Sequence, residues 1–167
     1  CLPYGDGITF WPIAEVVREC AEILETDNPE EARAKLLALV GDDEIVERVA
    51  ATIGLLEAPF QVAELFWGIR RFFEVLAAER PIAVVFDDIH WAEQTFLDLI
   101  GRLTETTEDA PLMILCTARH ELLEKQPTWA EGPDEHRIVL NPLSDAASGR
   151  VIEDPLGGAG WTHSVPG

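Results

Sequence analysis

The sequence predicts an α/β fold, with a helix-rich N-terminal half followed by a parallel sheet with flanking helices. Two short, continuous apolar runs, at residues 82–86 and 112–116, are typical of strands buried on both faces, as in parallel sheets. The runs begin 30 residues apart (82 and 112) and a helical pattern at 92–104 lies between them. This is the spacing of one strand–helix–strand crossover.

Four helices are predicted before the first strand. Asn28 can cap the second, which stops at Gly41, and Asp42 or Asp43 can cap the third. The fourth runs from about Gln61 to Glu79. The first helix is predicted from apolar residues at helical spacing: Ile13, Val16, Val17, Cys20, Ile23 and Leu24.

The chain after the second strand is less regular. A short helix is predicted around 121–125 and a third strand at 137–140. Ser144 can cap a last helix, which Pro155 interrupts. The Gly-rich tail at 157–167 is expected to be poorly ordered.

The composition limits the classes of partner. The 167 residues fit one domain or most of one, and the formal net charge is −19. We see no basic stripe, so direct binding to nucleic acid or to an anionic membrane by this segment is not expected. No apolar run approaches the roughly 20 residues of a membrane span. The charge is interpreted as a solvated acidic surface.

The three cysteines are irregularly spaced and form neither a zinc pattern nor a disulfide framework. Cys20 and Cys116 lie in apolar stretches and are expected to be core thiols, whereas Cys1 is the first residue. Free thiols are typical of a reducing compartment, which predicts a cytoplasmic location.

Two adjacent carboxylates, Asp87 and Asp88, directly follow the first predicted strand. Open α/β sheets place their ligands at the carboxyl ends of the strands. Successive side chains point in different directions, so one carboxylate can hold a hydrated Mg²⁺ while the other orients and deprotonates a water. ATP hydrolysis needs this division of labour. The alternative is an acidic helix cap in a loop.

His90 follows this pair, and its role stays open between a loop or capping residue and a functional one. Asp87, Asp88 and His90 are all potential metal ligands, so a metal-dependent phosphoesterase is an alternative class. The remaining histidines, at positions 120, 136 and 163, are scattered and complete no second cluster.

The second predicted strand is followed by Thr117 and Arg119. Both are expected to face the same crevice as Asp87, where an arginine can contact a terminal phosphate and report its presence or loss. The alternative is a surface arginine that pairs with this acidic protein.

At this point the residues resemble a known family. The segments FDDIHWAEQTFLDLI, LMILCTARHELL and LNPLSDAASGRVIEDPLGG resemble the ATPase domain of bacterial STAND-type AAA ATPases, as does the opening CLPYGDGITFWPIAEVVREC. Such signal-transduction ATPases occur in large regulators, joined to cyclase domains, LuxR-type DNA-binding domains or helical repeats. The resemblance covers roughly residues 1–160.

The resemblance implies a P-loop NTPase fold, with ATP and Mg²⁺ as cofactors. Asp87 matches the Walker B residue that holds Mg²⁺ through water, and Asp88 matches the adjacent catalytic base. Thr117 and Arg119 match the strand end called sensor 1, which implies that both bind the nucleotide and that Arg119 also takes part in catalysis. The implied partners are the nucleotide and other domains of the same parent chain. Oligomerisation of the parent, and an arginine finger from a neighbouring subunit, stay open.

One departure from the family matters most: the phosphate-binding loop GxxxxGK(S/T) does not occur in these residues. In the family it lies upstream of the part that Cys1 matches, and the sheet has the strand order 5-1-4-3-2. We therefore interpret the chain as an internal fragment with strands that resemble the third, fourth and fifth. The fragment is expected to be marginally stable and, on its own, not to hydrolyse ATP.

The predicted partial domain spans residues 1–156. Its parts are a helical segment at 1–80, a Walker B and sensor 1 segment at 81–143, and the start of a lid at 144–156. The leading function is an ATP-driven regulatory switch, with a non-catalytic protein-interaction module from a degenerate ATPase as the alternative.

Overall fold

The computed structural model describes residues 9–106, 110–132, 135–142 and 144. The chain divides into two compact units, residues 1–135 and 136–167, and each is considered by itself. The last helix expected after Ser144, the rest of the predicted lid and the tail lie outside the described residues.

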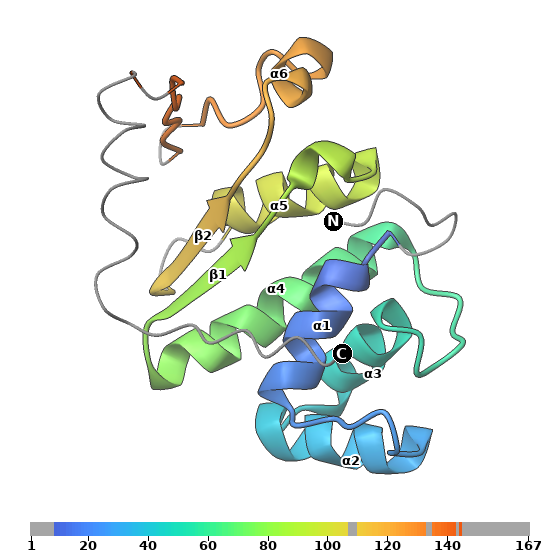
Figure 1. The fold of residues 1–167 in the computed structure, drawn as a ribbon. Helices are drawn as coiled ribbons and strands as arrows, with labels where there is room; N and C mark the ends of the chain where they lie inside the picture. Colours follow the sequence, from blue (N-terminus) through green and yellow to red (C-terminus); the bar gives the residue numbers. More distant parts are fainter. Residues whose placement is uncertain (1–8, 107–109, 133–134, 143, 145–167) are drawn as a thin grey trace, which may run out of the picture. The chain divides into compact units, whose positions relative to one another are not determined.

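The first unit confirms the predicted α/β class, with a helix-rich first half and a small parallel sheet (Figure 1). Helices α1 to α3 gather around the long helix α4, and the strands lie beside α4 and α5. The elements, in order, are α1 (Trp11–Cys20), α2 (Pro29–Val40), α3 (Asp43–Thr52), α4 (Val62–Glu79), β1 (Ile82–Phe86), the 3₁₀ turn η1 (Ile89–Trp91), α5 (Gln94–Thr106), β2 (Leu112–Cys116) and α6 (Glu121–Lys125).

The sheet confirms the predicted crossover unit. β1 and β2 pair in parallel, with Ile82 opposite Leu112 and Phe86 opposite Cys116, and α5 connects them. One face packs on the core, where the Phe86 and Phe96 rings meet edge to face with centroids 5.2 Å apart. A single hydrophobic cluster joins this face to α1 through α5. The sheet therefore rests on the helical half of the chain.

The other face of the sheet corrects the expectation of strands buried on both sides. Val85, Met113 and Leu115 are each at least half exposed, at 57%, 58% and 50%. The register places Val85 opposite Leu115, so these apolar side chains form one surface. Parallel sheets usually carry a helix layer on each face, and no described element provides the second layer here.

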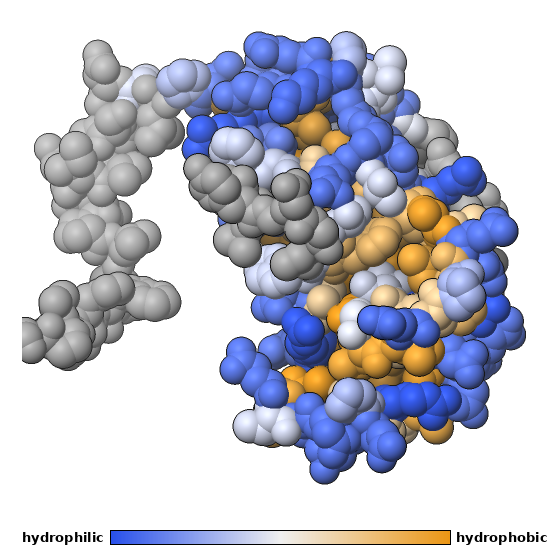
Figure 2. Space-filling view, turned by 90° about the vertical axis from the view of Figure 1, so that its right-hand side faces the viewer, coloured by the Kyte–Doolittle hydropathy of each residue, from blue (hydrophilic) through white to orange (hydrophobic). Residues whose placement is uncertain are grey.

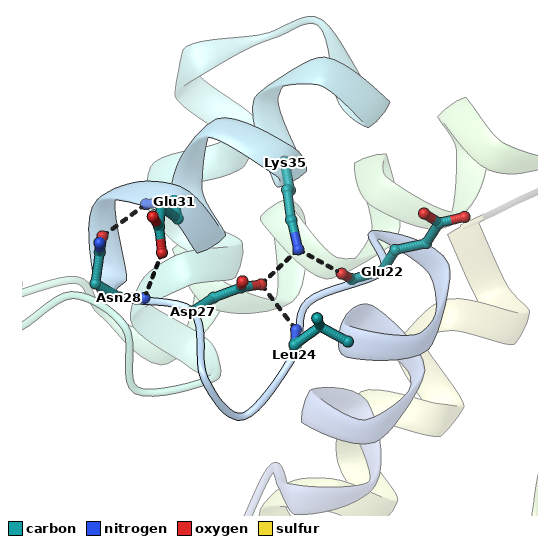
Figure 3. Close-up of polar contacts among 6 residues, drawn as sticks. All are labelled: Glu22, Leu24, Asp27, Asn28, Glu31 and Lys35. Carbon is teal, nitrogen blue, oxygen red and sulfur yellow. Dashed lines mark hydrogen bonds and ion pairs between the residues drawn. The ribbon is translucent and has the colours of Figure 1, made fainter.

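The capping residues predicted for α2 and α3 are confirmed. Asn28 and Glu31 form a reciprocal capping box, in which each side chain accepts a hydrogen bond from the other residue's backbone N–H (Figure 3). Gly41 ends α2 in the left-handed conformation, with φ of 73°. The Asp42 carboxylate accepts from the first backbone N–H groups of α3. These polar caps satisfy groups that the helix itself leaves unpaired.

Helix α1 ends at Cys20, four residues before the predicted end at Leu24. Glu22 adopts a φ of 52°, its N–H bonds the carbonyl of Glu19, and the N–H of Ile23 bonds the carbonyl of Arg18. This pair of bonds is the Schellman closure, which normally uses glycine at the left-handed position. Leu24 is consequently 60% exposed instead of buried on the helix.

The predicted third strand at 137–140 is not formed. Residues 135–142 carry no strand assignment, and Ile138, Val139 and Leu140 are 81%, 64% and 88% exposed. A strand needs a neighbour to bond with, and the described residues provide none for this segment.

The expectation of core thiols is wrong for Cys20, which is exposed, and only partly right for Cys116, which is half-buried. Cys1 lies outside the described residues. Burial, and to a lesser extent the charge of Glu135, raises the pKa of the Cys116 thiol to about 11. None of the described helices is long and apolar enough to cross a membrane.

Candidate functional site

The carboxyl ends of β1 and β2 lie side by side, and their pairing continues past both strands. The backbone N–H of Thr117 donates to the carbonyl of Phe86 at 3.0 Å. The N–H of Ile89 donates to the carbonyl of Thr117, also at 3.0 Å. These bonds hold the loop after β1 against the loop after β2, as expected for parallel strands.

The Thr117 hydroxyl contacts both predicted carboxylate residues. It donates a hydrogen bond to Oδ1 of Asp87. It also accepts one from the backbone N–H of Asp88, at 3.1 Å. Three of the four predicted site residues are thus brought together by one side chain. Asp87 and Asp88 are both exposed, so a ligand can reach their carboxylates.

Asp88 has the left-handed backbone conformation, with φ of 56° and ψ of 40°. Such a conformation is uncommon for residues other than glycine, although aspartate and asparagine tolerate it better than most. It turns the chain from the end of β1 into η1. The hydrogen bond to Thr117 holds this conformation, and residues in it are often found at functional sites.

His90 is the neighbour of the site whose role the sequence left open. Its side chain is only 5% exposed, and Nδ1 lies 3.6 Å from Oδ1 of Asp88. Neither ring nitrogen has a hydrogen-bond partner among the described residues. The ring also lies against that of Trp91, with centroids 5.0 Å apart. His90 is therefore a buried histidine beside the Asp88 carboxylate, and sequence periodicity carries no signal for this burial.

Arg119 lies two residues beyond Thr117, with an exposed side chain. Its carbonyl accepts the N–H of Leu122, at the start of α6. The structure places Arg119 on the loop that follows β2, at the predicted end of the sheet. No interaction that we observe among the described residues joins its guanidinium to Asp87 or Asp88.

The donor atoms at this edge fit a hydrated Mg²⁺. The Asp87 carboxylate offers oxygen ligands, which Mg²⁺ prefers, and Mg²⁺ commonly keeps several waters while using one or two carboxylates. Within the described part of the chain, no group of three or more His, Cys, Asp or Glu side chains is arranged to hold a metal ion directly.

Comparison with known families identifies the family of this domain. The profile of the AAA ATPase domain family matches residues 1–115, which include both aspartates. The chain belongs to this AAA ATPase domain family. Its resemblance to an AAA-type P-loop NTPase domain is thereby confirmed. Thr117 and Arg119 follow the matched segment.

A second comparison finds an uncharacterised protein of Rhizobium meliloti (strain 1021) that is 26% identical to this AAA domain over 73 residues. The match covers 44% of this chain and 7% of that protein. The chain thus spans a small part of its relative's length. No solved structure matches the chain.

Proposed function

We propose that this AAA domain supplies the magnesium and water side of an ATP-hydrolysing site, in a regulator of signal transduction or transcription. The observation that carries the proposal is the Thr117 hydroxyl, which bonds Asp87 and the backbone of Asp88 at the carboxyl ends of two parallel strands. That is where α/β sheets bind ligands. In such a switch, nucleotide stabilises one arrangement of the domain and hydrolysis releases it.

Each residue of the site has one proposed role. Asp87 holds Mg²⁺ through water, and the bound ion would neutralise charge on the phosphates. Asp88 orients the attacking water and accepts its proton. Thr117 fixes the two aspartates relative to each other, and Arg119 contacts the terminal phosphate.

The other side of the proposed site is a phosphate-binding loop. GxxxxGK(S/T) does not occur in these 167 residues, so this loop would come from another part of the parent protein. The backbone N–H groups and the lysine of such a loop hold the phosphates. The 167-residue chain by itself is expected to show no ATP turnover, and turnover by the purified chain would refute this part of the proposal.

The experiment that tests the function compares substitutions in the parent protein. Asp88→Asn should leave ATP bound but lower turnover by about 10²–10⁴-fold, the usual contribution of general acid–base catalysis. Asp87→Ala should instead weaken Mg²⁺-dependent ATP binding. The matched control is Asp98→Asn, which removes the same charge from the exposed surface of α5. Unchanged turnover in Asp88→Asn would remove the base assignment.

The exposed sheet face favours a second candidate, a non-catalytic interaction module. Val85, Met113 and Leu115 form an apolar surface. Hydrophobic residues also gather between hydrophilic ones on the face of the protein shown in Figure 2. If the parent protein binds no ATP, and Leu115→Ser still abolishes its regulatory output, the domain acts as an interaction module and not as an ATPase.

A further inference from the structure

We propose that His90 positions Asp88, by donating a hydrogen bond from Nδ1 to one oxygen of the Asp88 carboxylate. This inference rests on the proposed role of Asp88 as the base. The 3.6 Å between Nδ1 and Oδ1 is slightly longer than a hydrogen bond. Catalytic hydrogen bonds are often long before ligands bind and tighten in the complex.

The burial of His90 is the first reason for the proposal. Buried polar atoms nearly always have hydrogen-bond partners, and an exception needs an explanation such as a catalytic role or a bound water. The His90 side chain is 5% exposed, and both of its ring nitrogens lack a partner among the described residues. Among described charged atoms, the Asp88 carboxylate is the one observed near this ring.

The second reason is that the ring is held while the carboxylate can move. Ile89 is fully buried, the Trp91 ring lies against His90, and α6 packs on η1. The Asp88 side chain is 54% exposed and therefore has room to rotate. Rotation of the Asp88 carboxylate towards the ring would shorten the 3.6 Å between Nδ1 and Oδ1.

Two residues would then fix Asp88 from different sides. The Thr117 hydroxyl holds its backbone N–H, and His90 would hold Oδ1 of its carboxylate. The second oxygen, Oδ2, stays available to accept a proton from water. This arrangement requires a proton on Nδ1 of the His90 ring. Trp91 and α6 act on the geometry of the His90 ring and have no part in the proton transfer.

The test uses steady-state ATP hydrolysis by the parent protein. In His90→Asn the side-chain amide nitrogen replaces Nδ1, so kcat should stay within about threefold of the unsubstituted protein, whereas His90→Leu should lower kcat by about 10–100-fold. The KM for ATP should not change in either variant, because the bond acts on the base and not on nucleotide binding. Equal loss of kcat in both variants, or a raised KM, would overturn the proposal.

A spectroscopic measurement separates this inference from the proposed function. The parent protein is labelled with ¹⁵N-histidine, and the His90 signal is assigned by its absence in His90→Asn. The expected spectrum shows the proton on Nδ1, and Asp88→Ala should shift that nitrogen. A proton on Nε2, or an Nδ1 signal unchanged by Asp88→Ala, would refute the bond, even if Asp88→Asn abolishes turnover. If Asp88→Asn keeps full turnover but Nδ1 responds to Asp88→Ala, the base assignment fails and the contact stands.

Discussion

The Thr117 hydroxyl donates a hydrogen bond to the Asp87 carboxylate, joining the ends of two strands across 30 positions of sequence. The same oxygen accepts the backbone N–H of Asp88. One hydroxyl thus couples both carboxylate residues to β2. In the proposed site, ATP turnover therefore depends on Thr117, because its hydroxyl sets the positions of Asp87 and Asp88.

Thr117→Val keeps the shape of this side chain but removes both hydrogen bonds. We expect ATP turnover by the parent protein to fall about tenfold or more, because small misplacements of catalytic groups are costly. Thr117→Ser keeps the hydroxyl and is the matched control. Equal turnover in the serine and valine variants would show that the hydroxyl does not organise the site.

The close approach of α3 and α4 gives a prediction about stability. A Cβ at Gly68 would lie 2.5 Å from Cβ of Arg48, whose guanidinium is placed over the rings of Phe60 and Trp67. Gly68→Ala should therefore lower the free energy of unfolding by about 1–3 kcal/mol, as overpacking does. Urea denaturation of the 167-residue chain measures this change.

The matched control is Gly101→Ala in α5. An added Cβ at Gly101 meets nothing within 4 Å, so the substitution should raise the free energy of unfolding by about 0.4–1 kcal/mol. A gain in stability from both substitutions would contradict the observed packing of α3 on α4.

Asp27 gives a prediction about pH. Its carboxylate accepts hydrogen bonds from Lys35 at 2.6 Å and from the N–H of Leu24 at 2.8 Å, as Figure 3 shows. These bonds, that of Lys35 first, hold the pKa of Asp27 below its ordinary value of 3.8. Because the folded pKa is lowered, the contribution to stability is present above pH 3.8 and is lost as the pH falls towards the folded pKa.

We therefore expect Asp27→Asn to lower the midpoint of urea denaturation at pH 7. The difference in midpoint between this variant and the unsubstituted chain should narrow below about pH 4. Asp43→Asn, which breaks the exposed pair with Arg33, is the control, and a small effect is expected. If the difference in denaturation midpoint between Asp27→Asn and the unsubstituted chain stays constant from pH 7 to pH 3, the pKa of Asp27 is not lowered by folding.

The thiols should differ in reactivity. The pKa of Cys116 is raised to about 11 and its side chain is half-buried, so at pH 7 only about one thiol in 10⁴ is the reactive thiolate. Cys20 is exposed. In a Cys1→Ser chain, iodoacetamide should label Cys20 well before Cys116, as read by mass spectrometry of peptides. Faster labelling of Cys116 would show that its position in β2 does not shield the thiol from iodoacetamide.

Some features follow from sequence because they are local or repeat a strong pattern. The apolar runs predict β1 and β2 because short, continuous apolar runs are typical of strands in parallel sheets, although one face of this sheet is exposed. Once both strands are placed, Asp87 and Thr117 must lie at one edge of the sheet. The Asn28 cap is predicted because its partner, Glu31, is three residues away.

Other features depend on contacts that sequence patterns do not encode. The end of α1 was missed because Glu22 occupies the left-handed position where glycine is the usual signal. The strand at 137–140 was predicted from composition, but strand formation depends on a partner. His90 is buried in η1, which packs against α6, and these two elements are separated in sequence by α5 and β2.

The most direct test of the proposed site is a single turnover of ATP bound to the parent protein, with and without Asp88→Asn. We expect the variant to bind Mg²⁺-ATP as tightly as the unsubstituted protein but to fail to convert it to ADP on the same timescale. Conversion of bound ATP at the unsubstituted rate would show that Asp88 does not activate the attacking water.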